Sequence, residues 1–79
     1  MKKRHFMRIR ARMYELCLRQ SDLARHLKCH YTHTGALLNA RTEWKRNEMI
    51  ETLKFIKVGI SEENIYHYFF DSEIENRLK

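Results

Sequence analysis

The sequence predicts an all-α fold, a compact five-helix bundle formed by a single domain that spans residues 1–79. Proline is absent and glycine occurs only twice, which leaves little of the turn chemistry that β-hairpins need. Apolar residues recur at three- and four-residue intervals along most of the chain, the spacing of a buried helix face. A chain this short buries on the order of two thirds of its unfolded surface. It therefore has little room for a deep substrate cavity, and we expect no catalytic site.

The first predicted helix has one apolar face and a basic remainder. Its apolar residues fall three or four positions apart, as the inner side of a helix requires. Arginine occupies much of the rest, so we expect this helix to present a basic exterior. The apolar residues are Phe6, Ile9, Met13 and Leu16, and the basic residues are Arg4, Arg8, Arg10 and Arg12.

Two shorter helices are predicted within the stretch QSDLARHLKCHYTHTGALLNAR, residues 20–41. Ser21 is expected to cap the first of them, because its hydroxyl can accept bonds from free helix amides. Lys28 to Tyr31 interrupt the apolar pattern. Imidazole caps a helix less well than a hydroxyl does. The second short helix is therefore expected to begin either after a cap at His30 or at Thr32. The apolar stripe consists of Leu23, Ala24 and Leu27 in the first short helix, and of Thr34, Leu37 and Leu38 in the second.

The remainder of the chain predicts two further helices and a short tail at residues 71–79. Thr42 is expected to cap the fourth helix, and Gly59 to end it in the left-handed conformation. Ser61 is expected to cap the fifth helix, and the Ser-x-x-Glu pattern from Ser72 to Glu75 has the form of a capping box. The candidates for the inner side of the fourth helix are Trp44, Met49, Ile50, Leu53, Phe55 and Ile56, and the apolar content of the fifth helix is carried by Ile65, Tyr66, Phe69 and Phe70.

Positive charge is concentrated in the first half of the chain. Residues 1–41 hold ten Lys or Arg and two acids, a net charge of +8. Residues 42–79 hold six Lys or Arg and eight acids, a net charge of −2. This asymmetry favours a polyanionic partner, most plausibly nucleic acid.

The paired short helices resemble the helix-turn-helix of the phage Cro and repressor family, the xenobiotic-response-element type of bacterial regulator. The family pattern reads roughly Q-x-x-L-A-x-x-L-G-V-S-x-x-x-I-S-x-I-E-N-G. A later stretch, VGISEENIYHYF, resembles the family's closing L-G-V-S-x-x-x-L-F. The resemblance covers about residues 8–70 and implies a lambda-repressor-like DNA-binding domain with its motif at about residues 20–40. The matching residues are Gln20, Leu23, Ala24, Leu27 and Asn39.

The chain departs from the family pattern mainly at the helix ends. Lys28 stands where glycine usually opens the turn, and His30 stands where Ser or Thr usually caps the recognition helix. Arg19 replaces the usual Thr cap of the helix before it. Leu38 replaces the usual Glu before Asn39, either as an added core residue or as an exposed apolar one. We expect these differences to alter the helix ends and to leave the fold intact.

The resemblance implies a sequence-specific transcription regulator, Cro-like or repressor-like, of phage or mobile-element origin. Its recognition helix would enter the major groove of double-stranded DNA and read base edges, while flanking residues would contact phosphates. The operator sequence and the choice between repression and activation stay open. The residues expected to bind DNA are Gln20, Tyr31, Thr32, His33, Ala36, Asn39, Arg41, Lys45 and Arg19.

The aromatic run from Tyr66 to Phe70 suggests a protein contact. Five consecutive bulky residues cannot all face inward on one helix, so we expect one or two exposed rings. A homodimer through this segment would follow. The alternative function is a protein-binding modulator, antirepressor-like, which keeps the fold and acts on another regulator protein. The residues of the expected dimer contact are Tyr66, Tyr68, Phe69 and Phe70.

Other classes of site have weaker support in the sequence. A zinc site is suggested by five residues, but their spacing crosses the predicted turn and no CxxC pair occurs. We therefore expect no metal and no cofactor. There is no signal-peptide pattern and no apolar run long enough to span a membrane, so we expect a cytoplasmic protein. The residues that suggest zinc are Cys17, His26, Cys29, His30 and His33.

Overall fold

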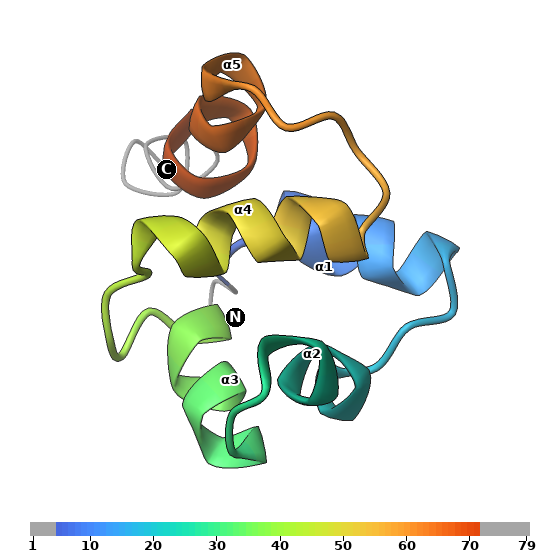
Figure 1. The fold of residues 1–79 in the computed structure, drawn as a ribbon, viewed down its shortest axis with the longest axis vertical. Helices are drawn as coiled ribbons and strands as arrows, with labels where there is room; N and C mark the ends of the chain where they lie inside the picture. The colour runs from blue at the N-terminus through green and yellow to red at the C-terminus, as the bar shows by residue number, and fades with distance from the viewer. Residues whose placement is uncertain (1–4, 72–79) are drawn as a thin grey trace, which may run out of the picture.

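The computed structural model describes residues 5–71, and within them every regular element is a helix. The all-α prediction is therefore confirmed for this part of the chain. A turn of π-helix, η1, continues α5 directly and completes the domain (Figure 1). The elements in chain order are α1 (Met7–Glu15), α2 (Gln20–Leu27), α3 (Tyr31–Leu38), α4 (Arg46–Phe55), α5 (Glu62–Ile65) and η1 (Tyr66–Asp71).

The core lies around α4, which crosses the middle of the molecule between two groups of helices. In Figure 1, α2 and α3 lie below α4, α5 and η1 lie above it, and α1 runs behind it. Three rings join the N-terminal, central and C-terminal segments: the Trp44 ring lies 5.7 Å from that of Phe6 and 4.8 Å from that of Phe69. The buried core residues are Phe6, Ile9, Met13, Leu23, Leu38, Leu53, Ile56, Ile65 and Phe69.

Helices α1 to α4 all end in a Schellman motif. After each helix one residue turns left-handed, and the next residue donates its amide to a carbonyl of the last turn. At the end of α1, for example, Leu18 N–H donates to the Met13 carbonyl at 2.8 Å. Glycine usually fills the left-handed position, but this chain uses other residues at all four. They are Cys17, Lys28, Ala40 and Lys57, with φ values of 57°, 57°, 58° and 59°.

Two of the predicted N-terminal caps are wrong. Helix α4 begins at Arg46 and not after Thr42, because the Glu48 carboxylate accepts the Lys45 amide at 2.8 Å and caps the helix there. Helix α2 begins at Gln20, so Ser21 lies inside it. Its first turn is closed instead by Asp22, which accepts the amide of Arg19 at 2.9 Å.

Of the two predicted helix ends around α5 that lie within the described residues, one is confirmed and one is wrong. Ser61 caps α5 as predicted, since its hydroxyl accepts the Asn64 amide at 3.1 Å. Gly59 does not take the left-handed conformation that ends α4, because Lys57, two residues earlier, takes it. The predicted capping box from Ser72 to Glu75 lies outside the described residues.

The described arginines of α1 do not form the basic exterior that the sequence predicts. Each is half-buried and reaches back to a carbonyl oxygen of another element, which for Arg10 and Arg12 lies at the end of a helix. Arg10 Nη2 donates to the Leu38 carbonyl at 2.8 Å, and Arg12 Nε to the Ile56 carbonyl at 3.0 Å. Arg8 Nη1 donates to the His67 carbonyl and to a carboxylate oxygen of Asp71, both at 2.8 Å. These side chains therefore fasten α1 to α3, α4 and η1.

Candidate nucleic-acid interface

Helices α2 and α3 form a closely packed pair joined by only three residues, Lys28 to His30. In Figure 1, α2 is viewed almost end-on while α3 runs along the page, so their axes cross steeply. Gly35 permits this approach, because a Cβ atom there would lie 3.0 Å from Nε2 of Gln20. The left-handed φ of Lys28 reverses the chain where the resembled family uses glycine.

The first turn of α3 is exposed on one side and anchored on the other. His30 caps the helix, with Nδ1 accepting the Thr32 amide at 3.2 Å, so α3 begins at Tyr31 and the alternative start at Thr32 is wrong. Tyr31 is 54% exposed and Thr32 is also exposed. Leu37 is fully buried, as predicted. The leading turn therefore presents the Tyr31 phenol and the Thr32 side chain to solvent, with the Thr32 hydroxyl 2.8 Å from Nδ1 of His30.

Gln20 lies against this exposed turn. Its Nε2 donates to the Tyr31 carbonyl at 3.4 Å, so the start of α2 is tied to the start of α3. Arg19, the residue before α2, is exposed beside it. The structure thus gathers Arg19, Gln20, Tyr31 and Thr32, four of the predicted site residues, at one end of the helix pair.

His33 is less available than the sequence predicts. Its Nε2 lies 2.8 Å from Oε2 of Glu48 on α4, and its side chain is 38% exposed. The Nε2 edge of the imidazole is therefore occupied by Glu48, and Nδ1 is the nitrogen left for contact with a base. Ala36 is also half-buried, so its methyl group contributes less exposed surface than predicted.

The Glu48 carboxylate is a shared anchor for α3 and α4. Its burial opposes ionisation, but hydrogen bonds from the Lys45 amide and His33, with the positive charges nearby, outweigh it and lower the pKa of Glu48. A carboxylate with a lowered pKa stabilises the fold above its unfolded pKa, and that stability is lost as pH falls through the folded pKa.

Replacing Glu48 tests this anchor. Glu48→Ala is expected to lower the free energy of unfolding by about 1–2 kcal/mol at neutral pH, because α4 loses its cap. Glu48→Gln keeps an oxygen for the Lys45 amide but removes the charge, so stability should depend less on pH below about pH 5. Chemical denaturation between pH 7 and pH 3 measures both effects. Equal pH dependence in the wild type and in Glu48→Gln would contradict the role of the charge.

The other predicted site residues follow α3. Asn39 is exposed, and its Oδ1 accepts from Arg10 Nη2 at 3.0 Å, which leaves the amide NH₂ as its outward donor. Arg41 and Lys45 are exposed in the segment that leads to α4. Glu43 adds an exposed acid between them. Asn39 and Arg41 follow the far end of α3 from Tyr31, whereas the Lys45 amide bonds to the same Glu48 carboxylate as His33 and so lies near the first turn of α3.

Two residues that position this surface were missed in the sequence. Glu48 could have been found, because a Glu three residues after a helix cap is a known capping pattern. Arg10 could not, since its contact with Asn39 joins positions 29 residues apart.

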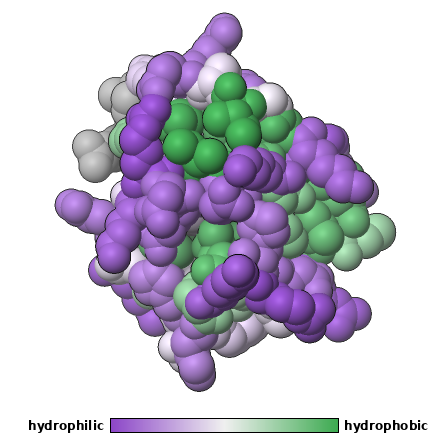
Figure 2. All heavy atoms as spheres, viewed as in Figure 1, coloured by the Kyte–Doolittle hydropathy of each residue, from purple (hydrophilic) through white to green (hydrophobic). Residues whose placement is uncertain are grey.

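Hydrophilic residues dominate the surface around α2 and α3. Figure 2 shows them over most of the lower half of the molecule, whereas hydrophobic residues gather near α5 and along the right edge. The acids close to α2 are engaged with cations: Asp22 lies 3.9 Å from Arg25, and Glu51 lies 3.0 Å from Lys54. These two acids are therefore partly neutralised by a cation of their own helix.

The histidines and cysteines that suggest zinc have separate partners. His26 lies 3.4 Å from Glu51 and packs on Phe55, whereas His30 caps α3. Burial and the nearby charge of Glu48 raise the pKa of the Cys29 thiol, which favours the unreactive neutral form. Within residues 5–71 no three His, Cys, Asp or Glu side chains form a group that could hold a metal ion.

The C-terminal aromatic residues divide between core and surface. Tyr66 and Phe70 are exposed, at 53% and 46%, and His67 is exposed as well, so three of the five residues are exposed where one or two were expected. Tyr68 is half-buried. Phe69 is only 3% exposed and packs on Trp44, so its predicted place in a dimer contact is wrong.

No protein family, characterised protein or solved structure matches this chain. Within the described part of the chain, none of the helices has the length and apolar character required to cross a membrane.

Proposed function

We propose that this protein is a sequence-specific DNA-binding regulator of the helix-turn-helix type, Cro-like or repressor-like, with α3 as its recognition helix. One observation carries the proposal: the first turn of α3 exposes Tyr31 and Thr32 while Leu37 anchors the opposite face. Phenol and hydroxyl groups can bond to base edges in the major groove, and the threonine methyl can contact thymine.

The charges around this turn support the same proposal. Arg19 precedes α2, and Arg41 and Lys45 follow α3, so exposed cations lie at both ends of the helix pair. Such residues bind phosphates and fix the register of a protein on the duplex. The outward amide of Asn39 adds an uncharged donor for the same purpose.

The experiment that tests this function is selection of bound duplexes from a random pool. We expect recovery of a short common sequence, because base contacts from α3 discriminate between duplexes. A pool that stays random after repeated rounds would contradict sequence-specific binding.

Single substitutions should separate base contacts from phosphate contacts. Thr32→Val is expected to weaken binding to the selected duplex by about 1–3 kcal/mol and to change binding to random DNA little. Arg41→Ala should weaken both by the same factor, because phosphates are present in every sequence. Fluorescence anisotropy on the two duplexes measures each ratio, and equal losses for both variants on both duplexes would refute the division.

A protein-binding modulator is the second candidate, favoured by exposed apolar side chains outside the helix pair. Tyr14 is 85% exposed and Met7 is 46% exposed, both on α1. A modulator would bind a purified regulator and leave DNA unbound, so a gel shift run beside a binding assay with that regulator separates the two functions.

A further inference from the structure

His33 and Glu48 form an ordered pair beside the leading turn of α3. Nε2 of His33 lies 2.8 Å from Oε2 of Glu48, while Oε1 of Glu48 accepts the Lys45 amide at 2.8 Å. The Glu48 side chain is only 14% exposed, so water competes little for either bond. Each oxygen of the carboxylate is therefore committed to a different partner.

The charge of Glu48 decides which nitrogen of His33 carries the proton. Burial opposes ionisation, but the hydrogen bonds from Lys45 and His33 lower the pKa of Glu48, so the carboxylate is ionised at neutral pH. An ionised carboxylate can only accept hydrogen bonds. Nε2 of His33 must therefore donate, and in a neutral imidazole the other nitrogen, Nδ1, is then an acceptor.

Nδ1 of His33 is available to a partner outside the chain. Within residues 5–71 this nitrogen has no hydrogen-bond partner, and 38% of the His33 side chain is exposed. His33 directly follows Tyr31 and Thr32, the exposed residues proposed to read bases. An acceptor in this position can bind an amino group in the major groove, either N6 of adenine or N4 of cytosine.

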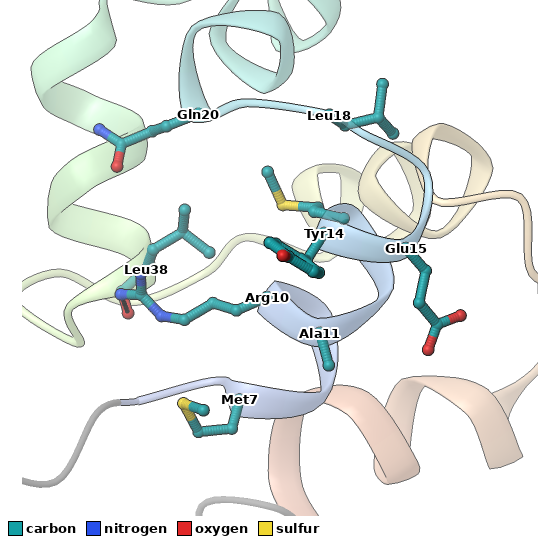
Figure 3. Close-up of a pocket in the computed structure, with 9 residues that line it drawn as sticks. Met7, Arg10, Ala11, Tyr14, Glu15, Leu18, Gln20 and Leu38 are labelled. Atoms are coloured by element: carbon teal, nitrogen blue, oxygen red, sulfur yellow. Dashed lines mark hydrogen bonds between the residues drawn. The ribbon is translucent and has the colours of Figure 1, made fainter.

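The leading turn of α3 is held from both neighbouring helices, which fixes the position of this acceptor. Glu48 holds the turn from α4, and Gln20 holds it from α2, since Gln20 Nε2 donates to the Tyr31 carbonyl at 3.4 Å. Figure 3 shows Gln20 extending from the start of α2 toward α3. A group that is positioned before binding loses less freedom on binding, so its contact contributes more to recognition.

We propose that Glu48 is a specificity-determining residue, which fixes His33 as a hydrogen-bond acceptor and so directs it to adenine or cytosine in the bound duplex. Glu48 is a positioning residue, because it acts on the base only through His33. The reading of a base rests on the proposed function, but the state of His33 can be tested without DNA.

Glu48→Gln should invert this arrangement while keeping the shape of the side chain. The Lys45 amide can only donate, so it retains the glutamine oxygen as its acceptor. The glutamine NH₂ group then donates to Nε2 of His33, and after exchange with water the imidazole proton is carried by Nδ1. His33 becomes a donor toward DNA and should prefer guanine or thymine, which present acceptors and no donor in the major groove.

Long-range ¹H–¹⁵N NMR of the histidine rings tests the first step in the free protein. At about pH 8, above the usual histidine pKa of about 6.5, we expect the His33 proton on Nε2 in the wild type and on Nδ1 in Glu48→Gln. His30 is the internal control, because its Nδ1 accepts the Thr32 amide and its proton should stay on Nε2 in both proteins. A wild-type His33 with its proton on Nδ1, or a His33 that is unchanged in Glu48→Gln, would overturn the proposal.

Selection of duplexes at the same pH tests the second step. At one position of the recovered sequence, the wild type should favour adenine or cytosine by about tenfold, and Glu48→Gln should favour guanine or thymine by about the same factor. His33→Ala should lose the preference at that position alone, and adding Glu48→Gln to it should change nothing further. The same recovered sequence for the wild type and Glu48→Gln would overturn the proposal.

Two further readouts separate this role from a loss of folding or of DNA binding. Glu48→Gln keeps the oxygen that caps α4, so its helical circular dichroism spectrum should match that of the wild type. A pool that stays random for the wild type would contradict the proposed function and the reading of a base with it. In that case the NMR result alone decides whether Glu48 sets the state of His33.

Discussion

Replacing Phe69 by alanine is expected to lower the free energy of unfolding by about 3–5 kcal/mol, the usual cost of removing a buried phenylalanine ring. Phe69 is 3% exposed and lies against Trp44 and Phe6, with ring centroids 4.8 and 6.3 Å away. Its loss would open a cavity where three distant segments meet. Because small domains have a free energy of unfolding of only about 5–15 kcal/mol, this variant should lose a large part of its stability.

The neighbouring Phe70 provides the control for this substitution. It has the same side chain but is 46% exposed, so Phe70→Ala should change stability by less than about 0.5 kcal/mol. Urea denaturation followed by circular dichroism measures both variants. Similar losses in the two would contradict the assignment of Phe69 to the core and Phe70 to the surface.

Binding to duplex DNA is expected to fall by about 10³-fold or more between 50 and 200 mM salt, if about six phosphates are engaged. Neutralised phosphates release condensed counterions, and added salt opposes this release. The exposed side chains of Arg19, Arg41 and Lys45, with the amides at the start of α2, are the groups expected to make these contacts.

The salt slope also identifies which cations take part. Arg41→Ala should reduce the slope of log affinity against log salt by about one. Lys54→Ala, which removes an exposed cation from α4 that is paired with Glu51, should leave the slope unchanged. Anisotropy titrations at several salt concentrations give all three slopes. A flat dependence in the wild type would contradict phosphate contact altogether.

The inward faces of the helices could be predicted from spacing alone. Leu23, Leu37 and Leu53 are fully buried, because residues three or four apart share a helix face whatever the tertiary structure. The exposed leading turn at Tyr31 and Thr32 follows from the same periodicity. The sequence left open whether Leu38 belongs to the core or to the surface. The structure places it in the core, at 2% exposure.

The start of α4 is marked in the sequence only by the capping position of Glu48, and the tertiary contact that excludes the better cap Thr42 could not be predicted. Trp44 packs between Phe6 and Phe69 and donates Nε1–H to the Leu37 carbonyl at 3.1 Å. This contact accompanies a non-helical backbone at residues 43–45. The helix therefore starts after Lys45 even though Thr42 has better capping chemistry.

Neither the role of the α1 arginines nor the partner of His33 could be predicted from the sequence. A count of charges cannot tell which guanidinium groups face solvent and which bind helix-terminal carbonyls. Likewise, Glu48 lies fifteen residues after His33, and only the packing of α4 against the helix pair brings the two together. The sequence therefore predicted more side chains of α3 to be available for base contact than the structure leaves exposed.

The four left-handed helix ends leave room for greater thermal tolerance. A residue with a Cβ atom pays about 1–2 kcal/mol in this conformation, whereas glycine adopts it freely but costs about 0.4–1 kcal/mol through the more disordered unfolded chain. Cys17, Lys28, Ala40 and Lys57 therefore hold the domain below the melting temperature that its backbone could support. None of these four belongs to the candidate DNA contacts, so durability could be engineered separately from recognition.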